Sequence, residues 1–362
     1  MDHIYKLPAT EMIRHLKSGE ISPTEAVNVA FSRIDEVDSK VNAIPTLCRS
    51  RALKSAKLLE ENSLTKFQRK SDPNWLAGLP VVIKDLLDVE GVRTTYGSSI
   101  YQNHVPQSSD ILVKRIEENG GIVIGKSNTP EFGSGGTTFN SIFPSTSTPW
   151  DISKSSGGSS GGSAAALATG EIWLATGSDY GGSLRTPASF CGVVGLRPSP
   201  GRIAHGPRDL PFDTMAVEGP MARSVEDLAV FLDALTGSHP EDPIAMASPD
   251  TPFSASTKVS NKPYRAAFSP NLGVTNVDQE ISEICKRAVD QLIANGWDIT
   301  DDVPDFSDAM ETFHTIRAAY YVAGMSDMFT TNFEHLKSDN VWNIQKGLKQ
   351  TAEEVGAAEQ NR

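Results

Sequence analysis

The nine residues 155–163 are all serine or glycine, and this tract constrains the fold more than any other passage of the chain. Composition alone would favour a flexible linker between domains. The tract, however, runs directly into an alanine-rich segment, 164–168, that reads as a helix. A second glycine cluster, 177–183, follows a short strand predicted over 172–175. Two Gly/Ser turns that flank a tight helix–strand unit indicate backbone packed closely around something small.

The rest of the chain alternates short β-like runs with helices. The first 65 residues read as helices, one of which begins at Ser22 with a capping box. Strands are then predicted over 81–83 and 122–124, and the alternation returns over 265–299. Strands interleaved with helices argue for an α/β sheet that helices cover on both faces.

The composition excludes several classes of function. With 362 residues, 38% of them apolar, the chain is long enough to bury a large core. A formal net charge of −12 without a dense Lys or Arg run argues against direct binding of nucleic acid. Three scattered cysteines fit a reducing compartment. No apolar run approaches the roughly 20 residues that span a bilayer, and the start lacks a secretory signal, so we expect a soluble, cytoplasmic protein.

Consecutive glycines can serve two kinds of chemistry. A phosphate cradle uses glycine-rich amides at a helix N-terminus, but neither G-x-x-x-x-G-K-[ST] nor a strand–GxGxxG–helix arrangement is present. In an acyl-transfer site, the N–H groups of consecutive glycines stabilise an oxyanion while a serine attacks the carbonyl. Ser183, directly after Gly181 and Gly182, fits the second chemistry.

A serine nucleophile needs a base within hydrogen-bond reach. The seven histidines are poor candidates, because five lie far from the glycine clusters and His104 and His205 have no motif around them. Lys84 directly follows the apolar run 81–83, so a strand end would carry its stem inward. Burial there would lower the pKa of the lysine and yield a neutral amine that accepts a proton. An ordinary surface lysine stays open as the alternative.

Four motifs together resemble the amidase signature family, which includes fatty-acid amide hydrolase, bacterial amidases and the glutaminase subunit of the tRNA-dependent amidotransferase. They occur in the family's order, over residues 78–85, 157–166, 177–187 and 190–198. The resemblance implies the family's α/β fold, in which helices cover both faces of a central, mixed and twisted sheet. It also implies a reaction that needs no metal and no cofactor.

The resemblance assigns roles residue by residue. Lys84 matches the base lysine, Ser159 the bridging serine on a cis peptide, and Ser183 the serine that becomes acylated. The carbonyl of Gly133 is expected to line the substrate site. The oxyanion hole is expected from the backbone amides of Tyr180, Gly181, Gly182 and Ser183.

Three further motif positions are expected to be structural. Asp179 and Arg185 are expected to form a partly buried ion pair that holds the nucleophile turn. Cys191 lies in an apolar run without a base near it in the motif, so it reads as a core thiol.

The resemblance also implies a single amidase domain over 1–362, with a helical segment 1–70, a signature core 74–236 and a C-terminal part 237–362. Family members continue well past residue 362, so the C-terminal part is expected to be incomplete. The implied activity is hydrolysis of a small carboxylic amide through a serine acyl-enzyme, with no direct contact to nucleic acid or membrane. A homodimer stays open, as do two alternatives: the glutaminase subunit of the tRNA-dependent amidotransferase, or an inactive, truncated relic.

Overall fold

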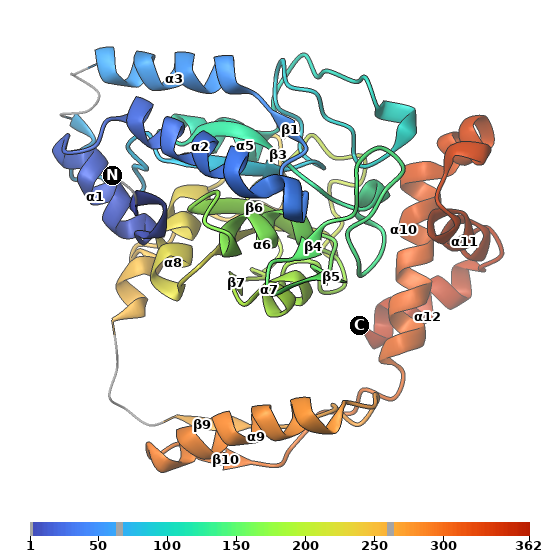
Figure 1. Cartoon of the computed structure of the whole chain (residues 1–362). Helices are drawn as coiled ribbons and strands as arrows, with labels where there is room; N and C mark the ends of the chain where they lie inside the picture. The colour runs from blue at the N-terminus through green and yellow to red at the C-terminus, as the bar shows by residue number, and fades with distance from the viewer. Residues whose placement is uncertain (1–2, 63–67, 259–263) are drawn as a thin grey trace. The chain divides into compact units, whose positions relative to one another are not determined.

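The computed structural model of the chain describes residues 3–62, 68–258 and 264–362 (Figure 1). They form two compact units. Unit 1 consists of Met1–Thr257 and Glu334–Lys337, and unit 2 consists of Lys258–Phe333 and Ser338–Arg362. Residues 63–65, the end of the helical start expected from the sequence, lie outside the described residues. The single amidase domain over 1–362 stays a prediction.

A six-stranded sheet forms the centre of unit 1, in the order β1-β3-β2-β6-β8-β7. The strands β3, β2 and β6 run parallel, whereas β8 is antiparallel to β6, and β1 and β7 are antiparallel to their neighbours. The sheet is therefore mixed, as expected. Its strands are β1 (Thr46–Leu47), β2 (Pro80–Lys84), β3 (Ile122–Ser127), β6 (Leu174–Asp179), β7 (Val194–Gly195) and β8 (Val217–Ala222).

Helices cover this sheet, which confirms the predicted α/β class. Helix α6 packs on four of the strands, α5 packs on β3, and α8 packs on β6, β7 and β8. The capping box at Ser22 starts α2, since its hydroxyl accepts from the Glu25 amide. The helices of unit 1 are α1 (Ala9–Ser18), α2 (Pro23–Val41), α3 (Arg49–Glu61), α5 (Ile111–Glu118), α6 (Gly161–Ala168), α7 (Arg185–Cys191) and α8 (Val225–Leu235). A hairpin joins β4 (Ser147–Thr148) to β5 (Asp151–Ser155), and short 3-10 helices are η1 (Ile4–Lys6), η2 (Ser99–Tyr101), η3 (Glu131–Gly133), η4 (Phe253–Thr257) and η5 (Phe333–His335).

The serine-glycine tract is packed backbone and not a linker. It leads directly into α6, whose residues from Gly161 to Leu167 are all buried. A Cβ on Gly162 would lie 2.3 Å from the Asn128 amide nitrogen and 2.5 Å from the Ala43 carbonyl oxygen, so only glycine allows this approach. The tract thereby brings the start of α6 against the ends of the central strands.

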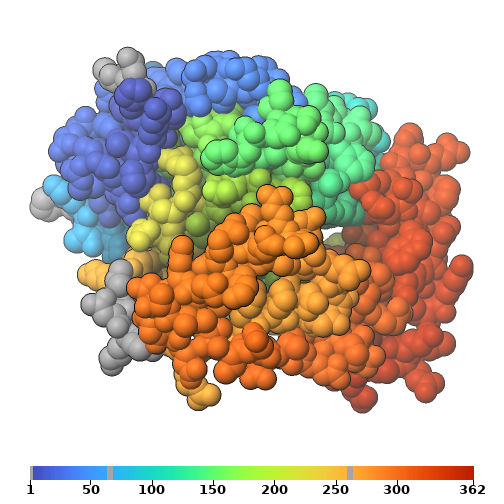
Figure 2. Space-filling model, turned by 60° about the horizontal axis from the view of Figure 1, so that its bottom comes forward, coloured from blue at the N-terminus to red at the C-terminus, as the bar shows by residue number. Residues whose placement is uncertain are grey.

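Unit 2 contains a βαβ segment and a group of helices. The strands β9 (Arg265–Ala267) and β10 (Asp298–Thr300) pair in parallel around α9 (Gln279–Ala294). No residue of 264–300 is buried, and Figure 2 shows this segment in orange as surface. Helix α10 (Ala309–Asn332) packs on α11 (Ser338–Gly347) and α12 (Ala352–Asn361). Among the described residues, no helix has the length and apolar character needed to cross a membrane.

Candidate active site

Lys84 ends the central strand β2 and is completely buried. Its Nζ donates to Ser159 Oγ at 2.7 Å and to Ser178 Oγ at 2.8 Å. The main-chain amide of Lys84 donates to Thr176 Oγ1 at 2.9 Å, which fixes the strand end against β6. Burial lowers the pKa of Lys84 to about 7, although the nearby carboxyls of Glu218 and Asp179 oppose the shift. Near neutral pH a large part of the amine is therefore unprotonated and able to accept a proton.

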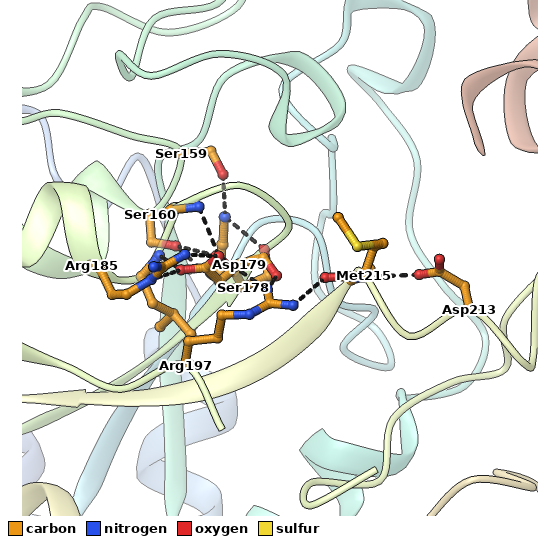
Figure 3. A network of polar contacts seen from close by, with 12 residues as sticks. Ser159, Ser160, Ser178, Asp179, Arg185, Arg197, Asp213 and Met215 are labelled. Carbon is orange, nitrogen blue, oxygen red and sulfur yellow. Dashed lines mark hydrogen bonds and ion pairs between the residues drawn. The ribbon is translucent and has the colours of Figure 1, made fainter. Parts of the chain in front are cut away.

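Ser159 precedes α6 and is only 2% exposed. It follows a cis peptide bond from Gly158, which is the backbone feature that the resemblance implied. Ser159 and Ser178, both labelled in Figure 3, come from different segments of the chain, and the hydroxyls of both accept from the Lys84 amine. The bridging position predicted for Ser159 is therefore in direct contact with the predicted base.

Ser183 is half-buried in the turn between β6 and α7. Its carbonyl accepts from the Ser160 amide at 3.2 Å, and the Ser160 hydroxyl accepts from the Ser178 amide at 3.2 Å. These bonds join the two Gly/Ser clusters. Over the described ranges, the Ser183 hydroxyl has no hydrogen-bond partner. The structure thus links Lys84 to Ser159 through side chains, and places Ser183 beside them through the backbone of Ser160.

Asp179 braces the turn that carries Ser183. Its fully buried carboxylate accepts from the amides of Gly182 and Leu184, at 2.8 and 3.1 Å. Arg185 adds two bonds at 3.1 Å, which confirms the expected ion pair, and Arg197 adds another at 3.1 Å (Figure 3). Burial opposes ionisation of Asp179, but these hydrogen bonds outweigh it and lower the pKa of the carboxyl.

The Asp179 contacts involve only some of the expected oxyanion donors. The Gly182 amide is engaged by Asp179, whereas no hydrogen bond of the Gly181 or Ser183 amide is found in the part of the chain that the structure describes. Gly182 has a φ of 122°, a conformation that favours glycine. The role of the Tyr180, Gly181 and Ser183 amides as oxyanion donors stays a prediction.

Removing the Asp179 carboxylate is expected to loosen this turn. In Asp179→Ala the buried amides of Gly182 and Leu184 lose their acceptor, and a stranded buried donor costs about 1–3 kcal/mol of unfolding free energy. Urea denaturation measures the loss. Asp151→Ala, a change at an exposed aspartate, should stay within about 0.5 kcal/mol of the parent protein. Equal stabilities of the two variants would contradict the bracing role.

The loop that holds Gly133 lies next to Ser159. A Cβ built on Gly133 would lie 3.5 Å from Ser159 Oγ. The loop is fixed by the buried carboxylate of Glu131, which accepts from Ser98 Oγ at 2.7 Å and from the Lys337 amide at 2.6 Å. Gly133 thus lies close to Ser159, and its place in the substrate site stays a prediction.

Cys191 is a core thiol, as expected. It is completely buried, its Sγ donates weakly to the Ser156 carbonyl at 3.6 Å, and burial raises its pKa to about 11. Within the described ranges there is also no group of three or more His, Cys, Asp or Glu side chains that could hold a metal ion.

Sequence reasoning missed three side chains of this site: Ser178, Arg197 and Glu218. Ser178 and Arg197 lie inside the recognised motifs, but nothing in the motifs gave them a partner. Glu218 lies on β8, beyond the motifs, and only the pairing of β8 with β6 brings it near Lys84.

The amidase family model matches residues 25–358. The chain therefore belongs to the amidase family, that is, to the amidase signature enzymes that its motifs resemble.

Curated relatives carry two kinds of name. An acylamidase of Rhodococcus erythropolis is 36% identical over 310 residues, which cover 86% of this chain and 64% of that protein. A glutamyl-tRNA(Gln) amidotransferase subunit of Carboxydothermus hydrogenoformans is 42% identical over 239 residues, which cover 66% of this chain and 48% of that protein. The chain thus spans between about half and two thirds of the length of these relatives.

Solved structures of amidase signature enzymes have the same fold. A bacterial aryl acylamidase of this family superposes with a TM-score of 0.88 at 25% identity, covering 98% of this chain and 75% of that one. A 6-aminohexanoate cyclic dimer hydrolase in complex with its substrate gives 0.86 at 26% identity, covering 98% of this chain and 74% of that one.

Proposed function

We propose that the protein hydrolyses the C–N bond of a carboxylic amide through a serine acyl-enzyme and releases ammonia or an amine. The observation that carries this proposal is the 2.7 Å hydrogen bond between the fully buried Lys84 amine and Ser159. Ser183 is the nucleophile, Ser159 relays protons, and Lys84 is the base. A buried lysine with a lowered pKa is the kind of group that such a relay requires.

The proposed reaction proceeds in three stages. Lys84 takes a proton from Ser159 as Ser159 takes one from Ser183, and Ser183 Oγ attacks the amide carbonyl. The tetrahedral intermediate collapses when Ser159 gives its proton to the leaving nitrogen and regains one from the Lys84 ammonium. Water then attacks the acyl-enzyme along the same relay, which restores all three side chains.

The developing oxyanion is proposed to bind the amides of Gly181 and Ser183. The loss of one such donor typically costs about 3–4 kcal/mol of transition-state stabilisation. The Gly182 amide supports them indirectly, because its bond to Asp179 fixes the turn, and Tyr180 stays a candidate for a further contact. The Gly133 carbonyl, in the loop next to Ser159, is proposed to orient the substrate.

A small carboxamide is the proposed substrate, because the chain is similar in sequence to a protein named acylamidase and similar in fold to one named aryl acylamidase. A second candidate follows from the relatives named as amidotransferase subunits: ammonia release from glutamine as part of a complex. Glutamine-dependent ammonia release that rises with a partner protein would favour the second candidate. A cytoplasmic location is proposed as well, in agreement with three free cysteines.

A fluorophosphonate probe tests the nucleophile directly. It reacts with activated serines, so we expect stoichiometric labelling of the folded protein, with peptide mapping assigning the label to Ser183. As labelling proceeds, the rate at which the protein hydrolyses a panel of simple amides, measured as released ammonia or amine, should fall in parallel. Folded protein that takes up no label would favour the inactive relic instead.

A further inference from the structure

Glu218 lies directly opposite Ser178 in the central sheet. The strands β6 and β8 are antiparallel, with Ser178 and Glu218 as Cα partners. Side chains of directly opposed residues leave the same face of a sheet, with Cβ atoms about 4.5–5.5 Å apart. Ser178 Oγ is one of the two hydroxyls that accept from Lys84 Nζ. The Glu218 carboxyl therefore starts on the face of the sheet that holds the Lys84 amine.

The Glu218 carboxyl is buried without a full set of partners. The residue is 7% exposed, and its Oε2 atom is buried with no hydrogen-bond partner among the described residues. Leaving a carboxyl in this state costs free energy, and such exceptions occur at functional sites. Neither hydrogen-bond acceptor of Lys84 carries a charge, because both are serine hydroxyls. Compensation for a Lys84 ammonium must therefore come from a carboxyl that does not touch it.

Few other charges face this pair. Lys84 on β2 is acted on by Glu218 on β8 and by Asp179 on β6. The Asp179 carboxylate is already bound by Arg185 and Arg197. Glu218 in turn faces Lys84, Asp110 at the start of α5, and Arg208, which pairs with Asp242 at 3.2 Å. Of the two described carboxyls that act on Lys84, Glu218 is thus the one that is not held in an ion pair.

We propose that Glu218 is a positioning residue of the hydrolytic relay, whose buried carboxyl stabilises the ammonium form of Lys84 when the amine takes the nucleophile's proton. This role presupposes the proposed amide hydrolysis. Burial alone would make the Lys84 amine a weak base, and the negative charge of Glu218 restores part of its basicity. A general base works best when its pKa lies near the working pH.

The electrostatics agree in direction. Burial raises the pKa of Glu218, and the charge of Lys84 opposes that shift, so the carboxylate form of Glu218 is favoured when Lys84 is an ammonium. Burial lowers the pKa of Lys84, and Glu218 is the first group that opposes this shift. Removing the Glu218 carboxyl should therefore lower the pKa of Lys84 further, and should never raise it.

The pH profile of kcat/KM tests the proposal. In Glu218→Gln we expect the acidic limb to move to lower pH by about one unit, the size of effect that the loss of a nearby buried charge produces. The plateau above the limb should stay within about tenfold of the parent rate. Glu218→Met, which leaves no polar atom behind, should shift the limb in the same direction, and Glu218→Asp should return it toward the parent position.

Glu171→Gln is the matched control. Glu171 is also buried, but it is not among the groups that act on Lys84. The acidic limb of the Glu171→Gln profile should therefore coincide with that of the parent protein. Suppose the acidic limb stays in place in both Glu218→Gln and Glu218→Met, while Ser183 of these variants still takes up fluorophosphonate. That result would overturn the role of Glu218 and leave the proposed function standing. Absence of label and of turnover in the parent protein would instead overturn the proposed function.

Discussion

Replacing Ser183 by alanine is expected to lower kcat for amide hydrolysis by roughly 10⁴- to 10⁶-fold, the range found when a serine nucleophile is removed from a cooperating triad. The acyl-enzyme forms on Ser183 Oγ, so without it the relay of Ser159 and Lys84 has no nucleophile to activate. Binding and the backbone amides of the turn remain, and they account for any residual rate. Ammonia or amine release at saturating substrate measures the loss.

The fold should survive this change. In the described part of the chain, no group would lose a hydrogen bond to the Ser183 hydroxyl. The main-chain bond from the Ser160 amide to the Ser183 carbonyl remains. The thermal midpoint should therefore stay close to the parent value. Ser189→Ala, at an exposed serine of α7 in the same motif region, should keep full activity. Retention of more than about one hundredth of the parent rate in Ser183→Ala would contradict the covalent role of Ser183.

Much of the architecture could be predicted from the sequence, because the patterns concerned are local. The apolar run before Lys84 predicted a buried strand end, and β2 has that form. The capping box at Ser22 predicted the start of α2. The tract at 155–163 resembles a linker in composition, and only its continuation into the alanine-rich α6 indicated packed backbone.

The second glycine cluster shows where local patterns fail. A strand was expected over 172–175, but β6 runs from Leu174 to Asp179 and takes in the first part of the cluster. Glycine, serine and aspartate have low strand propensity, yet here the pairing with the fully buried β8 decides the conformation. The extra length carries Ser178 to the Lys84 amine.

Glu218 could not be predicted for the same reason. It lies about 40 positions after Ser178 in the sequence, and an antiparallel register over such a distance has no local signal. Arg197 differs, because its guanidinium donates both to Asp179 and to the Met215 carbonyl, at 2.9 Å for the latter. A buried aspartate in a turn calls for cationic partners, but the sequence offered only Arg185 as a neighbour.

Replacing Lys84 by methionine is expected to lower kcat/KM by roughly 10³- to 10⁴-fold at pH 8, near the upper end of what a general base contributes. Methionine keeps an unbranched stem in the buried position, so no large cavity forms. Ser159 stays in place beside Ser178 but loses the amine that accepts its proton. Lys114→Met, at an exposed lysine of α5, is the matched control and should have the parent activity.

The pH profile distinguishes Lys84 from a rival group. In the parent protein, protonation of the amine below about pH 7 should lower kcat/KM tenfold per pH unit, because only the neutral amine accepts a proton. Burial also raises the pKa of Asp110 to about 7 and raises the pKa of Glu218, so Lys84 has two rival carboxyls for an acidic limb near that pH. His205 is not a third, since burial lowers its pKa to about 4. Lys84→Met retains both Asp110 and Glu218, so a residual rate that no longer varies between pH 6 and pH 8 assigns the limb to Lys84. A residual rate that keeps the limb assigns it to one of the two carboxyls and removes the lysine from the relay.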